Sequence, residues 1–183
     1  VLLCASRAVA GVAAAPTQPL QIEPLPAPVF DVREGFVLAA GDRLFAAGEG
    51  NGAPGLWSSG LEATGPWEKA NVPVPRGAAV APHANGWVMV GGSVDGEPTA
   101  TATKIELAGG EPRATSLPDL PEVVTGAGAA VVGDVLYVFG GGTGPGGTVP
   151  IKTFWTLDLK NPLAWRAGPE FPGAPRAGAG PRP

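Results

Sequence analysis

Residues 133–142 read GDVLYVFGGG, which is a two-residue turn, an apolar run and a closing stretch of glycine. Two other segments share this pattern, NGWVMVGG at residues 85–92 and GDRLFAAGEG at residues 41–50. The glycines that end the three runs are Gly48, Gly91 and Gly140. They are 43 and 49 residues apart. Repetition with a period of this size indicates similar units, each of which buries its apolar faces against its neighbours.

Two further markers recur in step with the glycine. An apolar residue followed by proline closes each unit, and the pairs are Leu25-Pro26, Val72-Pro73, Leu117-Pro118 and Phe171-Pro172. An aromatic residue precedes the proline pair in two units, as Trp67 and Trp165, whereas the middle unit has Arg113 there. Three markers in a common order favour a repeat over a β-sandwich whose strands happen to be evenly spaced.

Each unit is predicted to contain four strands. The first is a small apolar segment, at residues 35–40, 77–82 or 126–132, and a further one begins near Arg176. It ends in a tight turn, Gly41-Asp42, Asn85-Gly86 or Gly133-Asp134, whose residues tolerate a positive φ. The second strand is a continuous apolar run, clearest in VLYVF (135–139), and continuity predicts burial on both faces. The third is KIEL (104–107) or TFWTLDL (153–159), and the fourth leads to the proline pair.

Four-stranded units of about 45–50 residues are typical of a β-propeller. We therefore expect an all-β chain with blades at approximately residues 30–75, 76–121 and 122–173, and the start of another at 174–183. The domain as a whole is expected to span residues 19–183. The glycine after the second strand would let a neighbouring blade approach closely, and the aromatic residue would fill the wedge between blades.

The composition supports a folded, turn-rich chain and excludes several kinds of site. The 183 residues include 29 glycines and 22 prolines, but 44% are hydrophobic and only 15% are charged. Apolar burial can therefore offset the entropy lost on ordering. One cysteine, Cys4, and one histidine, His83, exclude a zinc site of Cys and His ligands and an internal disulfide. The net charge of −4 without a basic stripe argues against a nucleic-acid partner, and no cofactor or metal is expected.

The first 15 residues, VLLCASRAVAGVAAA, are apolar and end in small residues, like a secretory signal peptide. We expect residues 1–18 to be a leader that is cleaved near Ala15, so that the protein is secreted or periplasmic. The run lacks a basic start and is interrupted by Arg7, which leaves an N-terminal extension as the alternative. It is too short and too interrupted to span a membrane.

The doubled glycines after the second and third runs, with Tyr137 before one of them and Trp165 after it, resemble the kelch repeat. The third unit, residues 126–180, is similar in detail to the kelch-type sialic acid mutarotases, also called N-acetylneuraminate epimerases. The similar segments are GDVLYVFGGG, FWTLDL, WRAGPE and PGAPR. The first unit departs most, because Gly48-Glu49-Gly50 replaces the glycine doublet. The resemblance implies a six-bladed propeller, of which about three blades are present here.

Propeller sites usually lie at one end of the central channel, on the loops that enter the first strand and the loops between the second and third strands. These loops carry the candidate ligand-binding residues, which are Arg76, Arg176, Glu49 and Asp95. Mutarotation needs a base for the anomeric hydroxyl and an acid for the ring oxygen. An arginine can bind a sugar-acid carboxylate through two hydrogen bonds, although both arginines could instead bond to backbone carbonyls between blades.

Two other residues have expected positions away from this site. His83 is expected on the surface in the turn at the opposite end, and Tyr137 in the core. With a single tyrosine and a single histidine, the copper radical chemistry of galactose oxidases, which share the kelch propeller, cannot reside in this segment.

Two functions from different classes are consistent with the sequence. The first is that of an exported sugar mutarotase or epimerase acting on N-acetylneuraminate or a related sugar acid. The second is that of a non-catalytic kelch module that binds a protein or glycan. In both cases the flat apolar faces of the terminal blades are expected to contact the remaining blades of the same protein or to cause self-association.

Overall fold

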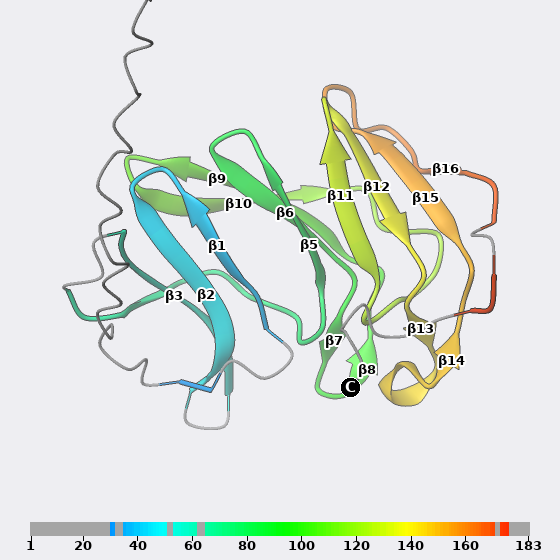
Figure 1. Cartoon of the computed structure of the whole chain (residues 1–183), viewed down its shortest axis with the longest axis horizontal. Coiled ribbons are helices and arrows are strands. Elements are labelled where there is room, and N and C mark those ends of the chain that lie inside the picture. The colour runs from blue at the N-terminus through cyan, green and yellow to red at the C-terminus, as the bar shows by residue number, and fades with distance from the viewer. Residues whose placement is uncertain (1–29, 32–34, 51–52, 62–64, 171–172, 176–183) are drawn as a thin grey trace, which may run out of the picture.

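The computed structural model describes residues 30–31, 35–50, 53–61, 65–170 and 173–175. They form three four-stranded antiparallel sheets that stand side by side (Figure 1). The strands of the first sheet are β1 (Val37–Ala40), β2 (Arg43–Gly50), β3 (Ala53–Gly60) and β4 (Glu68–Ala70). Those of the second are β5 (Ala79–His83), β6 (Gly86–Val90), β9 (Ala102–Ala108) and β10 (Glu111–Leu117). Those of the third are β11 (Gly128–Val132), β12 (Val135–Phe139), β15 (Phe154–Asp158) and β16 (Arg166–Ala167).

Two short hairpins extend the second and third units between their second and third strands. They are β7 (Ser93–Val94) with β8 (Glu97–Pro98), and β13 (Gly142–Thr143) with β14 (Val149–Pro150). The turn η1 (Pro145–Gly147) interrupts the second hairpin and is the one helical segment among the described residues. The prediction of an all-β chain with four strands in each unit is thus confirmed. The four-stranded sheets number three among the described residues, whereas a β-sandwich would have two main sheets.

The first strand of each sheet pairs with the second through a two-residue turn. Gly41 and Gly133 begin two of these turns with φ values of +60° and +61°, as the sequence predicts. In the second unit the turn lies one residue earlier than predicted, because His83 pairs with Gly86 and Ala84 takes the positive φ of +51°. Gly86 belongs to β6 instead, where an added Cβ would meet the backbone of Ile105.

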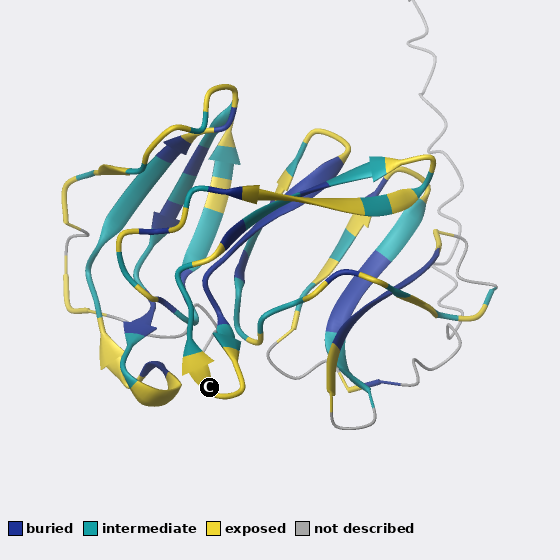
Figure 2. Cartoon of the chain, turned by 180° about the vertical axis from the view of Figure 1, so that it is seen from behind, coloured by how far each residue is buried: buried dark blue, intermediate teal, exposed yellow. Residues whose placement is uncertain are grey.

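The second sheet lies between the other two, and its strand β6 is buried along its whole length (Figure 2). Trp87 and Met89 pack toward the first sheet, in a cluster with Phe45 and Leu56. Val88 and Val90 pack toward the third sheet, in a cluster with Leu136. Continuous hydrophobicity in this strand therefore does mean burial on both faces, as predicted.

Strand β12 has the same continuous pattern and does not have the same burial. Leu136 and Val138, which are 0% and 2% exposed, face the second sheet. Tyr137, on the opposite face, is only partly buried and lies beside Phe154 with ring centroids 5.8 Å apart. The expectation that Tyr137 is a core residue is wrong for the described residues, because no further sheet lies against its face of β12.

Glycine and aromatic residues join the second sheet to the third. Gly91, with φ +64°, leaves no room for a Cβ because the carbonyl of Val124 lies against it. The next residue, Gly92, donates a backbone hydrogen bond to that carbonyl at 2.7 Å. Trp165 packs against the cluster between these sheets, and its indole N–H donates to the carbonyl of Pro118 at 2.8 Å. These contacts match the predicted roles of the glycine and the wedge aromatic.

Three expectations fall outside the described residues. They concern the leader at residues 1–18, the candidate site residue Arg176, and the further strand that was expected to begin near it.

Candidate functional site

Three equivalent backbone bridges define one end of the stacked sheets. In each unit a residue before the first strand bridges a residue just after the apolar core of the second strand, and the pairs are Asp31–Glu49, Arg76–Ser93 and Thr125–Gly142. The β7–β8 and β13–β14 hairpins project at this same end, the lower edge in Figure 1. Strand β8 contacts η1, so the hairpins of neighbouring units lie side by side. The loops that the sequence assigned to one end do meet there.

The first unit differs from the others at this end, and the difference positions Glu49. In the second unit β6 stops at Val90, and the following Gly91 and Gly92 turn the chain with φ values of +64° and +93°. In the first unit neither Gly48 nor Glu49 has a positive φ, and β2 continues to Gly50 in an unbroken ladder with β3. Where the second unit has a bend, the first thus has a straight strand that carries a carboxylate to the end of the sheet.

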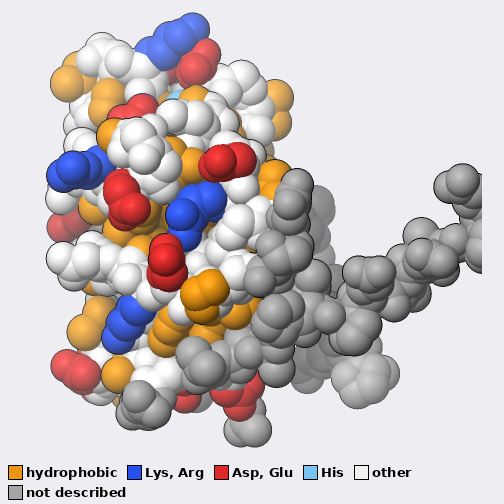
Figure 3. Space-filling model, turned by 90° about the vertical axis from the view of Figure 1, so that its left-hand side faces the viewer, with side chains coloured by type: hydrophobic (Ala, Val, Ile, Leu, Met, Phe, Trp, Pro, Cys, Tyr) orange, Lys and Arg blue, Asp and Glu red, His pale blue; other side chains and the backbone are white. Residues whose placement is uncertain are grey.

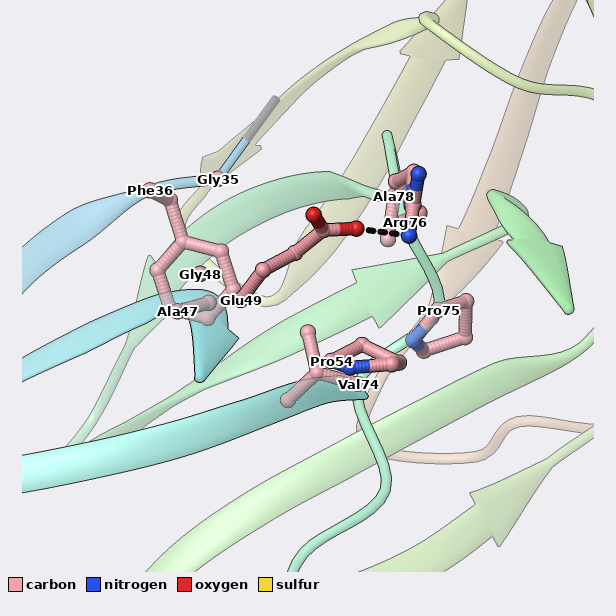
Figure 4. A pocket seen from close by; sticks show the side chains of 10 residues that line it. All are labelled: Gly35, Phe36, Ala47, Gly48, Glu49, Pro54, Val74, Pro75, Arg76 and Ala78. Carbon is pink, nitrogen blue, oxygen red and sulfur yellow. Dashed lines mark ion pairs between the residues drawn. The ribbon is translucent and has the colours of Figure 1, made fainter. Parts of the chain in front are cut away.

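Glu49 and Arg76 come from different units and form an ion pair (Figure 4). Backbone hydrogen bonds fix both residues. Glu49 exchanges two of 2.8 Å with Asp31, and Arg76 exchanges two of 2.7 and 2.9 Å with Ser93. The side chain of Glu49 is 28% exposed and that of Arg76 is 45% exposed, so the guanidinium is the more accessible partner. Oε1 of Glu49 is shielded from solvent and faces the guanidinium of Arg76 in the ion pair.

Apolar side chains surround this ion pair. A small cavity around it, open to solvent, is lined by Gly35, Phe36, Ala47, Gly48, Glu49, Pro54, Val74, Pro75, Arg76 and Ala78. Glu49 and Arg76 are the only charged members of that lining. An apolar wall lowers the local dielectric constant and strengthens each charge's interaction with a ligand. In such a wall the carboxylate of Glu49 can exchange a proton, and the guanidinium of Arg76 can bind an anionic group.

The other predicted site residues do not join this pair. Asp95 lies in the exposed turn of the β7–β8 hairpin with φ +52°, and it does not line the cavity. Arg176 lies outside the described residues. Arg76 was predicted to contact a ligand or to bond to backbone carbonyls between blades. Its backbone forms hydrogen bonds with Ser93, and its side chain forms the ion pair with Glu49. Sequence reasoning missed that pairing, and the signal was the loss of the glycine doublet in the first unit.

A second group of charges lies at the opposite end, between the turns of the second and third units. Asp134 accepts a hydrogen bond from Lys160 Nζ at 2.7 Å and lies 3.7 Å from Nε2 of His83. The hydrogen bond and charge of Lys160 hold the pKa of Asp134 below its ordinary value, and the hydrogen bond to Asp134 raises the pKa of Lys160. His83 is only 12% exposed, so the expectation of a surface residue is wrong, because the neighbouring turn covers it.

Some kinds of site are absent from the residues that the structure describes. They include no group of three or more His, Cys, Asp or Glu side chains placed to hold a metal ion. They also include no helix with the length and hydrophobicity needed to cross a membrane. On the side of the molecule where the first sheet lies, acidic and basic side chains are interspersed with hydrophobic ones (Figure 3).

Comparison with known proteins finds the kelch motif in this chain and two relatives that are similar to part of it. Residues 124–170 match the kelch motif family. A segment of 78 residues, 43% of this chain, is 37% identical to the N-acetylneuraminate epimerase of Pasteurella multocida strain Pm70 and spans 19% of that protein. A segment of 64 residues, 34% of this chain, is 44% identical to the N-acetylneuraminate epimerase of Haemophilus influenzae strain PittEE and spans 15% of it.

The matched segments thus span less than a fifth of the length of these curated relatives. The residues that match the kelch motif, 124–170, include all four strands of the third sheet. The described residues form stacked four-stranded sheets, the third of which matches the kelch motif, and part of the chain resembles N-acetylneuraminate epimerase.

Proposed function

We propose that this chain forms part of an exported sugar mutarotase or epimerase that acts on N-acetylneuraminate or a related sugar acid. The observation that carries the proposal is the Glu49–Arg76 pair, which combines a proton acceptor with a carboxylate-binding cation at the loop end of the blades. The partial similarity to two proteins named N-acetylneuraminate epimerase supports the substrate class.

In this proposal Arg76 binds the carboxylate of the sugar acid. A guanidinium has five N–H donors in a planar fork, so it can contact Glu49 and a second carboxylate together. Its side chain is 45% exposed, which leaves room for the ligand on the solvent side. Asp95 and Arg176 remain proposed ligand contacts from neighbouring loops.

Glu49 is the base we assign. Ring opening removes the proton of the anomeric hydroxyl while the bond between the anomeric carbon and the ring oxygen breaks and the ring oxygen gains a proton. The carboxylic acid formed on Glu49 is the proton source for that oxygen. Reclosure on the other face of the carbonyl reverses both transfers, so the cycle consumes no proton and needs no oxidant or reductant.

The test is exchange between the anomers of N-acetylneuraminate, followed by NMR in the presence of the protein. Glu49→Gln removes the base and Arg76→Lys removes the planar fork, so each is expected to slow the catalysed exchange by about tenfold or more. Arg43→Lys is the matched control, because Arg43 also pairs with a glutamate, Glu68 at 3.0 Å, outside the cavity. The control should leave the rate unchanged.

Two results would contradict the proposal. If Arg76→Lys lowers the melting temperature while activity per folded molecule is intact, Arg76 braces the blades and the site is wrong. If no sugar acid shows catalysed exchange with wild-type protein, the alternative of a kelch module that binds a protein or glycan replaces the enzyme. Export is tested separately by mass spectrometry of secreted protein, which should lack residues 1–15.

A further inference from the structure

Thr125 occupies in the third unit the position that Arg76 occupies in the second. Arg76 bridges Ser93 in its own unit, and its side chain pairs with Glu49 of the preceding unit. Thr125 likewise bridges Gly142 in its own unit, which places its side chain at the junction with the preceding, second unit. Equivalent positions therefore carry a guanidinium at the first junction between units and a hydroxyl at the second.

Close backbone contacts place Thr125 beside the loop that carries Arg76. The carbonyl of Gly77, which directly follows Arg76, accepts a hydrogen bond of 2.9 Å from the N–H of Gly126. A Cβ added at Gly77 would stand 2.8 Å from Oγ1 of Thr125, so the hydroxyl lies directly against the backbone of that loop. The hydroxyl of the third unit and the guanidinium of the second thus belong to adjoining loops at the same end of the sheets.

Packing of its methyl group holds the hydroxyl of Thr125 in place. Cγ2 of Thr125 lies against Gly147 of η1, so closely that a Cβ at Gly147 would not fit. With the methyl group packed on its own unit, Oγ1 is left on the side of the second unit, against Gly77. Thr125 is half-buried, and within the part of the chain that the structure describes its hydroxyl makes no hydrogen bond. A hydroxyl that can donate and accept, and whose direction is already fixed, binds a ligand with little further loss of entropy.

Ser93 supplies a second hydroxyl at this junction. Its backbone exchanges two hydrogen bonds with Arg76. The residue before it, Gly92, donates to the carbonyl of Val124, which precedes Thr125. Oγ of Ser93 lies 3.4 Å from the carbonyl oxygen of Arg76, which is longer than an ordinary hydrogen bond between a hydroxyl and an oxygen. The hydroxyl of Ser93 can therefore turn to a ligand at little cost, and the two neutral hydroxyls stand next to the charged pair.

We propose that Thr125 and Ser93 bind the chain of hydroxyl groups of the sugar acid whose carboxylate binds Arg76. This inference rests on the function proposed for the Glu49–Arg76 pair. N-acetylneuraminate carries its carboxylate at one end and a short chain of hydroxyl groups at the other. A charged group at the first junction and neutral hydroxyls at the second match these two ends. Because Thr125 lies against the residue that follows Arg76, one ligand can contact both junctions.

The assignment makes Thr125 a residue that determines specificity and not a catalytic one. A site that is built to hydrogen-bond a hydroxyl discriminates against a ligand that lacks it, because the polar group of the site is then left unpaired. The proton transfers assigned to Glu49 take place at the anomeric centre, on the carboxylate side of the ligand. Loss of the Thr125 hydroxyl should therefore raise KM for N-acetylneuraminate and leave kcat nearly unchanged.

The experiment measures the dissociation constants of two ligands by NMR titration of the intact protein: N-acetylneuraminate and an analogue with a shortened hydroxyl chain. Thr125→Val keeps the shape and the methyl group but removes the hydroxyl, so it should weaken binding of N-acetylneuraminate about three- to tenfold. It should leave the affinity for the shortened analogue unchanged, and Ser93→Ala should act in the same direction. Thr125→Ser keeps the hydroxyl and should restore the preference for N-acetylneuraminate. Thr115→Val, at an exposed position of β10, is the matched control and should change neither affinity.

Arg76→Lys tests the other end of the ligand and should weaken both ligands by the same factor, because both carry the carboxylate. Equal affinity of wild-type protein for the two ligands, or an equal effect of Thr125→Val on both, would overturn the inference and leave the proposed function intact. Wild-type protein that binds N-acetylneuraminate without speeding its anomer exchange would contradict the enzymatic proposal, whereas a selective loss in Thr125→Val would still support this contact. Binding of neither ligand would overturn both.

Discussion

Single residues at the ends of the second strands decide what each unit can do. Gly91 and Gly92 turn the chain sharply and let Val124 approach, which joins two sheets. Glu49 replaces that bend with a straight strand and brings a carboxylate to the cavity instead. The same position thus serves sheet packing in the second unit and carries a charged side chain in the first, and the difference depends on whether a glycine occupies it.

The close approach at Gly91 leads to a measurable prediction. Gly91 and Gly133 have nearly equal positive φ values, +64° and +61°, but only Gly91 has backbone atoms where a Cβ would go. Gly133→Ala should lower the free energy of unfolding by about 1–2 kcal/mol, because a left-handed residue other than glycine is strained. Gly91→Ala should cost about 1–3 kcal/mol more, because Val124 must also move. Urea unfolding of both variants measures the difference, and equal losses would show that the contact is unimportant.

At the scale of elements, the pattern of a strand predicts its faces only when its neighbours are known. The four strands of each unit, the turns at Gly41 and Gly133 and the wedge role of Trp165 follow from local residue order, so they could be predicted from the sequence. The burial of Tyr137 could not, because VLYVF and WVMV have the same apolar character and differ only in what packs outside.

The candidate site shows the same limit. The sequence placed Glu49 and Arg76 in loops at one end, because both stand next to a strand boundary. It could not pair them, since the ion pair joins two units and depends on β2 continuing straight to Gly50. It also left His83 on the surface, because the covering Asp134 belongs to the next unit.

The Asp134–Lys160 ion pair at the turn end of the third sheet should make stability depend on pH. The pKa of Asp134 is lowered in the folded chain, chiefly by Lys160, so its stabilising effect is present above the ordinary aspartate pKa and is lost as the pH falls through the lowered value. The pKa of Lys160 is raised, so its effect is present below the ordinary lysine pKa and is lost as the pH rises through the raised value.

The corresponding variant is Asp134→Asn. It should melt at a lower temperature than wild type near neutral pH, and the difference should vanish well below 3.8, the ordinary pKa of the carboxyl. Thermal melts across this range provide the measurement. Glu111→Gln, which removes an exposed carboxylate on β10, is the control and should show no such convergence. A difference that persists in acid would mean that the carboxylate charge is not involved.

At the scale of the whole molecule, stability should be greatest in the middle sheet. Strand β6 is buried on both faces by the flanking sheets, whereas the β7–β8 and β13–β14 hairpins are two-stranded and carry exposed residues. Local opening is easiest where few apolar contacts are lost. Amide hydrogen exchange followed by mass spectrometry should therefore find β6 the slowest and these hairpins the fastest of the described strands. Exchange in β6 as fast as in the hairpins would mean that the sheets do not stack stably in solution.

The small hairpins between the second and third strands have a consequence for how such a molecule can diversify. Each is a separate two-stranded ladder that hangs from the end of a blade, and the ladder of the blade does not run through it. Insertions and deletions there leave the stacked cores unchanged, because surface loops tolerate changes in length at little cost in free energy. New recognition loops could accordingly be grafted at residues 94–97 and 143–149, one blade at a time, with the blades kept as an unchanged frame.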